Sequence, residues 1–549
     1  MKRLLHNCGN LIVVGLKDRA FLVVQESSKS GERSSSSNNN DDDDDHKDTS
    51  EVMAVLELVT SHTTNSNSNG NSNGNGNADQ DATNNTAVAK VEQAGEEQRK
   101  SQQYQLDLMD ITAVAVTSSS SSPLAVDSSL SRTDSVTDKV TYFCVVARND
   151  KTLSIYNISM EDITTTSASK TGSITTIEPT MVYQSPKRVS CLVFANLPRN
   201  ENNSKDNDDE KKNVAAIPIP VLISCDLAGD AYAYSLLGRK GKRLLLGHTA
   251  SMLTGVALVP SRNSNDSDID DSNNDYHGDC IVTADRDEKI RISRFPESYI
   301  IERYLLGHTN YVTDIASVNG EPSLLVSCGG DMMLRLWNWK TGQQIGNVAV
   351  DGSGKIPTDL ATTRSSSDTQ GDEYFVAVIY DDCNRLSLYK IHHDAKPADH
   401  APEFLLSLVC TIDCPSQPLS IAFEEGNNGG TLLFVLMREP DYALTYTIVE
   451  KEDGKTVLTE FNDTISCKGL KLLRELAAKE DISMPQTILE KDQYGNPVLQ
   501  KENENRGPAS ADAPWNRVER VEIARQREKR QKKRRLQRAD AATEQKTES

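Results

Sequence analysis

Residues 281–293 read IVTADRDEKIRIS, residues 325–337 read LVSCGGDMMLRLW, and these two stretches decide the fold. Each contains two short apolar runs that flank a polar turn, which is the pattern of an antiparallel β-hairpin. Each also follows a Gly-His pair, at residues 247–248 and 307–308, and these pairs lie 60 residues apart. Without a polar insertion of roughly 16 residues, the repeat is about 44 residues long, the period of a propeller blade.

The same hairpin pattern recurs along the chain with few amphipathic helices between its copies. Short strands at regular spacing are typical of all-β repeats, and seven blades need roughly 280–320 residues, which the chain of 549 residues can supply. We therefore expect an all-β fold, a seven-bladed propeller. Seven segments have the shape of a strand, a turn and a second strand: 10–24, 142–158, 221–236, 280–295, 324–339, 374–391 and 431–449.

We expect residues 1–460 to form the propeller, 461–512 a helix and connector, and 513–549 a basic tail. Stretches rich in Ser, Asn, Asp and Gly interrupt the propeller, and they contain too few apolar residues to offset the entropy of ordering. We interpret them as disordered insertions at about 28–50, 61–103, 118–138, 199–212 and 261–279.

Four residues of the second repeat have the types and spacing of a hydrogen-bonded tetrad: His308, Ser327, Asp331 and Trp337. In such a network the turn Asp accepts from His, which in turn bridges to Ser and Trp, and a fully satisfied buried network locks the edge of a blade. The first repeat aligns with it, Asp287 opposite Asp331 and Ser293 opposite Trp337. A Ser-His-Asp hydrolase triad is the alternative interpretation of these residue types.

Charge, cysteines and hydropathy narrow the functional class. The net charge is −20, with five consecutive aspartates at 41–45, so nucleic acid would meet local basic patches and not the whole surface. Ten scattered cysteines include no CxxC pair, and residues 410 and 414 alone form a weak zinc candidate. No apolar run approaches the length of about 18 residues that a membrane helix needs. We expect no metal site and no membrane association.

Enzyme signatures are missing from the sequence. No glycine-rich loop precedes a helix, so the sequence indicates neither a phosphate-binding loop nor a dinucleotide or methyl-donor fold. We therefore expect no catalytic residues and no cofactor in this chain.

Two features follow the predicted propeller. Residues 468–479 have the pattern of a helix with apolar Leu470, Leu472, Leu473 and Leu476, either a strut packed on the propeller or a groove-binding helix.

Residues 517–538 carry eleven Lys and Arg against three Glu, a local charge of +8. This tail is a nuclear localisation signal, a contact to RNA phosphates or a solvated segment. The candidate RNA-binding residues are Arg525, Arg527, Lys529, Arg530, Lys532, Lys533, Arg534 and Arg535.

The string TADRDEKIR at 283–291, residues 301–308 and the following GGD and LRLW motifs resemble one family of WD-repeat proteins. That family is the non-catalytic subunit of the tRNA (guanine-N7-)-methyltransferase. The resemblance is dense over 245–345 and loose elsewhere, and the polar insertions resemble those of the insect members called Wuho. This chain has Trp337-Asn338 where many repeats have Trp-Asp.

The resemblance implies a heterodimer in which a separate catalytic subunit holds S-adenosylmethionine and methylates a guanine N7 of tRNA. It implies that this chain docks on and stabilises that subunit and helps to hold the tRNA. Because the sequence shows neither a secretory core nor a membrane helix, we expect the chain in the nucleus, with the cytoplasm as a second location. The resemblance also places a basic, partner-facing residue at Arg291, helped by Lys289 and Arg286. The strand 289–292 alternates, so Lys289 and Arg291 share one side.

Three alternatives remain from the sequence. A generic WD-repeat scaffold in nuclear RNA or ribosome assembly would have the same repeats. A substrate receptor of a cullin ligase usually carries a Trp-Asp-x-Arg box, for which the counterpart at 337–340 lacks both charges. An enzyme in its own right is the third. Affinity purification distinguishes the first two, because recovery of a methyltransferase or of pre-ribosomal factors points to different complexes.

Overall fold

The structure is a computed structural model. It describes residues 4–8, 11–25, 53–59, 110–118, 141–159, 175–197, 219–236, 241–249, 251–260, 279–351, 354–367, 371–393, 404–425, 431–450, 455–461, 465–482, 484–485, 489 and 497–499. The predicted insertions lie outside these residues, apart from Ser118 and Asp279 at their ends.

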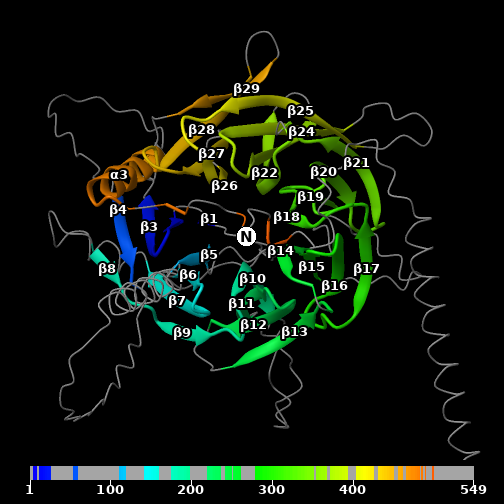
Figure 1. The fold of residues 1–549 in the computed structure, drawn as a ribbon, viewed down its shortest axis with the longest axis horizontal. Coiled ribbons are helices and arrows are strands. Elements are labelled where there is room, and N and C mark those ends of the chain that lie inside the picture. The colour runs from blue at the N-terminus through cyan, green and yellow to red at the C-terminus, as the bar shows by residue number, and fades with distance from the viewer. Residues whose placement is uncertain are drawn as a thin grey trace, which may run out of the picture. The chain divides into compact units, whose positions relative to one another are not determined.

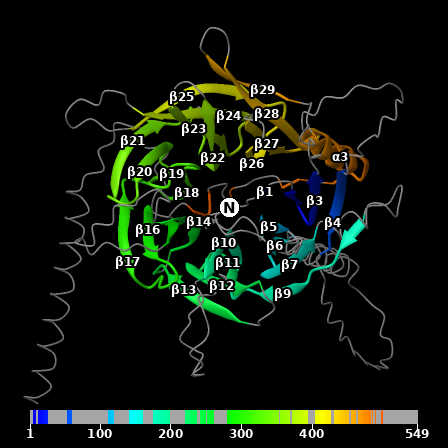
Figure 2. The same ribbon diagram turned by 180° about the vertical axis from the view of Figure 1, so that it is seen from behind.

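The described chain forms a ring of seven antiparallel sheets, the blades of a β-propeller, as the repeated hairpins predict (Figures 1 and 2). Blade 1 contains β1 (Leu5–Cys8), β2 (Leu11–Leu16), β3 (Arg19–Gln25) and β4 (Met53–Leu58), with β8 (Thr175–Ile177) parallel to β4. Blade 2 contains β5 (Ile111–Ser118), β6 (Thr141–Arg148), β7 (Thr152–Ser159) and β9 (Met181–Gln184). Blade 3 contains β10 (Val189–Leu197), β11 (Ile219–Asp226), β12 (Asp230–Ser235) and β13 (Lys242–Gly247).

The remaining four blades are continuous in sequence. Blade 4 contains β14 (Leu253–Val259), β15 (Cys280–Asp285), β16 (Lys289–Arg294) and β17 (Ile301–Leu306). Blade 5 contains β18 (Val312–Ser317), β19 (Leu324–Gly329), β20 (Met333–Asn338) and β21 (Gln343–Ala349). Blade 6 contains β22 (Pro357–Ser367), β23 (Gly371–Tyr380), β24 (Arg385–His393) and β25 (Phe404–Asp413). Blade 7 contains β26 (Pro418–Glu425), β27 (Thr431–Met437), β28 (Ala443–Glu450) and β29 (Thr456–Glu460).

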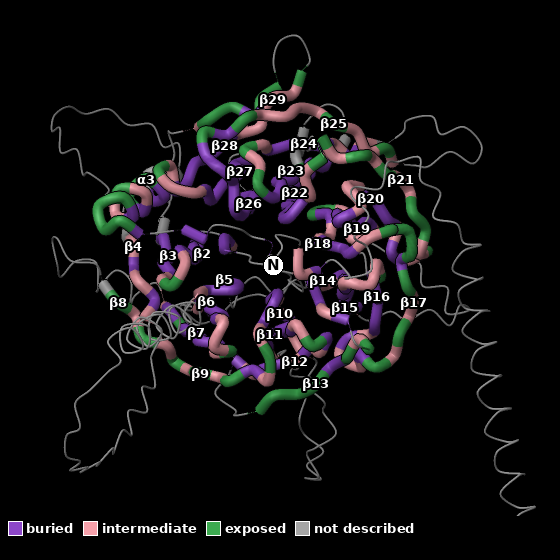
Figure 3. Tube along the Cα trace, viewed as in Figure 1, coloured by how far each residue is buried: buried purple, intermediate pink, exposed green. Residues whose placement is uncertain are grey.

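The second and third strands of each blade are the seven hairpins that the sequence predicts. They are rich in β-branched and aliphatic residues, and their side chains fill the space between neighbouring blades, where burial is deepest (Figure 3). The first strand of each blade lies nearest the centre of the ring and the fourth lies at the outside (Figure 1). Turns, loops and outer strands are therefore the parts of each blade that another molecule can reach.

Helix α3 (Ile465–Lys479) packs on β3 and β4 of blade 1 and on β28 of blade 7, beside the direct contact of β1 with β26. The strut interpretation of this helix is confirmed. Apart from β8 in blade 1, the strands of each described sheet come from one stretch of the chain. No strand from the start of the chain joins the sheet of blade 7 among the described residues. The helix therefore joins two blades that share no strand.

The contact of α3 with blade 1 is close. A Cβ atom on Gly469 would lie 2.5 Å from Val23 Cγ1, so only glycine permits this approach. Arg19 pairs with Glu57 at 2.7 Å and also with Glu480 just beyond the helix, while Arg474 reaches Asp441 of blade 7 at 3.4 Å. The pKa of the Arg19 guanidinium is raised, mainly by its hydrogen bond to Glu57. Among the described residues, no helix is long and apolar enough to span a membrane.

Two neighbouring leucines of α3 test this closure. Leu473 is 1 % exposed and belongs to the core shared by the first and last blades, whereas Leu472 is 42 % exposed. We expect Leu473→Ala to lower the free energy of unfolding by about 2–5 kcal/mol, because it leaves a cavity at the seam. Leu472→Ala is the matched control, with an expected change within about 0.5 kcal/mol. Equal effects in chemical denaturation would show that α3 does not close the ring.

Candidate partner-binding site

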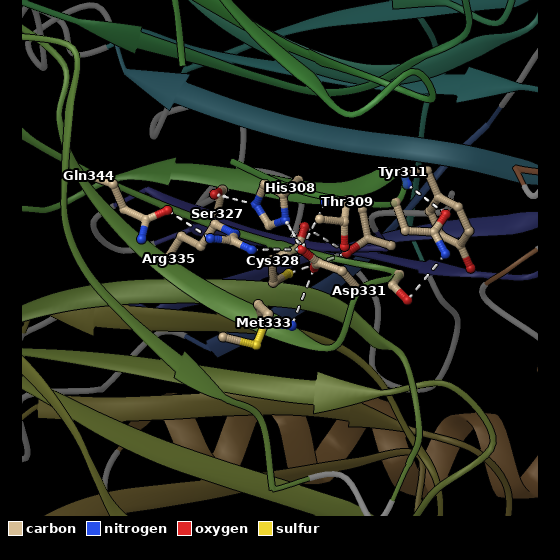
Figure 4. A network of polar contacts seen from close by, with 12 residues as sticks. His308, Thr309, Tyr311, Ser327, Cys328, Asp331, Met333, Arg335 and Gln344 are labelled. Atoms are coloured by element: carbon tan, nitrogen blue, oxygen red, sulfur yellow. Dashed lines mark hydrogen bonds and ion pairs between the residues drawn. The ribbon is translucent and has the colours of Figure 1, made fainter. Parts of the chain in front are cut away.

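The predicted tetrad residues come together in blade 5, where Figure 4 shows His308, Ser327 and Asp331 side by side. His308 Nδ1 lies 3.0 Å from both carboxylate oxygens of Asp331, and its Nε2 lies 2.8 Å from Ser327 Oγ. Trp337 Nε1 donates to the same Ser327 oxygen at 2.8 Å, so Trp337 joins the network through Ser327. Gly307 permits this packing, because a Cβ atom there would lie 2.9 Å from the Trp337 ring.

The network is structural in its chemistry. Ser327 is completely buried, so no substrate reaches its hydroxyl, and a hydrolase triad does not fit this environment. Burial alone would raise the pKa of the Asp331 carboxyl, but the hydrogen bond from His308 and the charge of Arg335 outweigh it and hold the pKa below its usual range. The carboxylate therefore stabilises the blade above about pH 4, and this contribution is lost as the pH falls through the lowered pKa.

Blade 4 carries a related network with a different acid. His248 Nδ1 lies 2.9 Å from Asp285 Oδ2, and its Nε2 lies 2.9 Å from Thr283 Oγ1. The strand register does place Asp287 opposite Asp331, since Thr283 pairs with Arg291 as Ser327 pairs with Arg335. Asp287 is nevertheless not the partner of His248. Blade 5 has Gly329 at the position of Asp285, so there the acid must come from two residues later.

Arg291 lies inside blade 4, with 6 % of its surface exposed. Its Nε donates to Ser293 Oγ at 2.8 Å, its Nη1 to the Gly247 carbonyl of blade 3 at 3.1 Å, and its Nη2 to the Ser298 carbonyl at 2.9 Å. Burial lowers the pKa of its guanidinium. These contacts predict that Arg291→Ala lowers the free energy of unfolding of the propeller by itself. The residue ties blade 3 to blade 4 and fixes the turn that precedes Tyr299.

The other two predicted partner-binding residues lie nearer the solvent. Lys289 is exposed and Arg286 is half-buried, both at the turn between β15 and β16 or just after it. The main-chain amide of Arg286 donates to the Met252 carbonyl at 2.9 Å. The eight candidate RNA-binding residues of the tail lie outside the described residues.

An exposed apolar strip, which the sequence analysis did not predict, lies on the outer strand β17 of blade 4 and the turn before it. Tyr299 is 70 % exposed and Leu306 67 %, and Ile301 and Tyr304 are also exposed. Leu306 pairs with Lys289, so the cation and the apolar side chains are neighbours. We call these five residues the blade-4 rim. The available signal was the run YLL at 304–306, which has no polar residue facing outward although it ends an outer strand.

Within the described residues, no group of three His, Cys, Asp or Glu side chains is arranged to hold a metal. Cys414, half of the weak zinc candidate, is buried and accepts a hydrogen bond from the Tyr446 hydroxyl. Burial raises the pKa of its thiol to about 11, which favours the neutral thiol over the thiolate that a metal binds.

Blade 4 lies in a region that is similar to known proteins. Residues 238–453 match the family model described as "tRNA methyltransferase TRM82 WD40 domain". This part of the chain is similar to the TRM82 and WDR4 proteins. The matched region includes blades 4 to 6 completely, and with them the blade-4 rim and both His networks.

Three individual proteins are also similar to this chain in sequence. The Dictyostelium discoideum "tRNA (guanine-N(7)-)-methyltransferase non-catalytic subunit wdr4" is 28 % identical over 320 residues, 52 % of this chain and 63 % of that protein. The WDR4 protein of Homo sapiens is 42 % identical over 125 residues, 23 % of this chain and 26 % of that protein. The wuho protein of Drosophila mojavensis is 30 % identical over 173 residues, 31 % of this chain and 39 % of that protein. The chain thus spans less than two thirds of each of these relatives.

Asp285 and Asp287 provide a matched pair that tests the blade-4 network. Asp285→Ala removes the partner of His248 and the acceptor for the turn amides of Asp287 and Lys289. We expect it to lower the free energy of unfolding by about 2–4 kcal/mol, since it strands buried polar groups. Asp287→Ala should cost no more than about 1 kcal/mol. If chemical denaturation showed an equal loss of stability for both variants, or a larger loss for Asp287→Ala, Asp285 would not be the main acid of this network.

Proposed function

We propose that this chain is the non-catalytic subunit of a tRNA (guanine-N7)-methyltransferase, forming a heterodimer with the catalytic subunit and helping to hold tRNA. The blade-4 rim carries this proposal. It combines exposed aromatic and aliphatic side chains with a lysine, on a rigid blade within the region that matches the TRM82 family. Aromatic residues surrounded by charge are typical of protein interfaces, whereas exposed apolar clusters are uncommon on surfaces that stay in water.

Arg286, Lys289 and Arg291 are the proposed basic residues of this contact. Lys289, next to Leu306, is the cation that reaches furthest toward a partner. Arg291 would act mainly from beneath, because its hydrogen bond to the Ser298 carbonyl holds the start of the rim in place. Positioned charges at an interface direct association and set its register, while buried apolar contacts slow dissociation.

The chemistry of methyl transfer would belong to the partner, which we expect to bind S-adenosylmethionine. A rigid platform contributes by holding the partner and the tRNA in one orientation, and a large part of such a barrier comes from positioning. The basic tail would add contacts to tRNA phosphates that carry no sequence information. If so, a chain lacking 517–549 still joins its partner, but the complex binds tRNA more weakly and with a shallower dependence on salt.

The same tail supports the proposal of a nuclear protein, with the cytoplasm as a second location. A fluorescent fusion lacking 517–549 would lose its nuclear accumulation if the tail is a localisation signal. Unchanged accumulation would leave a contact to RNA phosphates or a solvated segment as the interpretation of the tail.

The interface is tested by a pair of equally drastic changes. Leu306→Asp places a charge in the proposed apolar contact, and we expect it to weaken association with the catalytic subunit about tenfold to a hundredfold. The control is Leu244→Asp, because Leu244 is 56 % exposed on the outer strand of blade 3. Both side chains are largely in solvent, so neither change should lower the melting temperature by more than a few degrees.

Calorimetry with the two purified subunits measures this difference. Equal affinities for the two variants would exclude the blade-4 rim as the interface. Recovery of pre-ribosomal factors without any methyltransferase in affinity purification would instead favour a generic scaffold in ribosome assembly.

A further inference from the structure

The same hydrogen bond recurs where the first strand of a blade begins. In blades 4, 5 and 6, the carbonyls of Met252, Tyr311 and Ile356 accept from a main-chain amide in the turn between the second and third strands, at 2.8–2.9 Å. Equivalent bonds occur in blades 2, 3 and 7, with acceptors Asp110, Arg188 and Gln417. These six residues therefore occupy one structural position, on the face of the ring that carries these turns, close to its centre.

Side chains at this position differ between the two sides of the ring. Asp110, Arg188 and Gln417 are polar, and Gln417 is buried. Met252, Tyr311 and Ile356 are apolar and consecutive around the ring, and we call them the apolar arc. Packing within a blade does not require this difference, because the hydrogen bond uses only the main chain.

The apolar arc is covered by the chain's own C-terminal residues. Leu489 is 1 % exposed and Leu499 7 % exposed, and both form one buried cluster with Tyr311, against which Met252 and Ile356 pack. Tyr311 itself is only 2 % exposed. Leucine side chains separated by ten positions in the sequence thus converge on three consecutive blades.

Between α3 and this cluster, the chain contacts another part of the same face. Ile482 and Met484 are buried against the core of the first and last blades. The main-chain amide of Met484 donates to Glu439 Oε1 at 2.6 Å, in the turn between β27 and β28 of blade 7. The described pieces after α3 lie near the centre of the ring in Figure 1, in orange to red beside β14 and β18. The described residues after α3 thus contact the seam at Ile482 and Met484 and the opposite blades at Leu489 and Leu499.

We propose that the apolar arc is a peptide-binding site whose resident ligand is this chain's own C-terminal segment, anchored by Leu489 and Leu499. Occupation in cis closes the turn face near its centre to other peptide ligands, which leaves the outer strands, including the blade-4 rim, as the accessible surfaces. This inference does not depend on the identity of the partner. A tethered ligand has a high effective concentration, so the site stays filled even when the isolated segment binds weakly.

A synthetic peptide tests the site with full-length protein. The peptide has the sequence of residues 482–500 and carries a fluorophore, and the matched control peptide has Asp in place of both leucines. The double variant Leu489→Asp/Leu499→Asp vacates the site, because two carboxylates do not enter an apolar cluster. We expect the double variant to bind the peptide at least about tenfold more tightly than the wild-type chain does, and to ignore the control peptide.

A double variant that melts like the wild type and binds both peptides equally, or neither, would overturn the proposal. If the double variant fails to fold, hydrogen exchange in the wild-type chain decides. The site predicts that the amides around Leu489 and Leu499 are protected in the same range as those of α3. Exchange at the rate of an unstructured peptide would show that the segment does not occupy the arc.

Discussion

Closure of the ring between its first and last blades is the constraint on which the rest of the structure depends. Each blade buries its hydrophobic faces only against its neighbours, so an open seam would expose two sheet faces to water. Helix α3 covers that seam by packing on β3, β4 and β28, and Arg19 ties it to Glu57 and Glu480. A helix remote from the repeats in sequence thus contacts both the first and the last blade, and the described residues Leu489 and Leu499 beyond it pack on the opposite blades.

The hairpins could be predicted from the sequence because they depend on local patterns. Alternating apolar residues and polar turns are visible within about 45 residues, the length of one blade, and the two Gly-His pairs mark the start of successive repeats. The helix at 468–479 was visible for the same reason, although the pattern could not say that Leu473 faces the core while Leu472 faces solvent.

Contacts between blades were not visible in the same way. The alignment of Asp287 with Asp331 is right in register, yet His248 pairs with Asp285, because an acid is present there and blade 5 has glycine instead. Alternation placed Arg291 beside Lys289 on one side of the strand, but only the structure shows that blade 3 and the Ser298 turn bury its guanidinium. The blade-4 rim was missed because exposure of an outer strand depends on what the next blade covers.

In the proposed function, the blade-4 rim holds the partner protein and the partner carries out the chemistry. The most direct test measures S-adenosylmethionine binding and methyl transfer to guanine N7 of tRNA by this chain alone, by the catalytic subunit alone, and by the two together. We predict that this chain alone binds no S-adenosylmethionine and transfers no methyl group. We also predict that the two subunits together methylate tRNA faster than the catalytic subunit alone. Micromolar donor binding by the isolated chain, or an unchanged rate for the pair, would contradict these predictions.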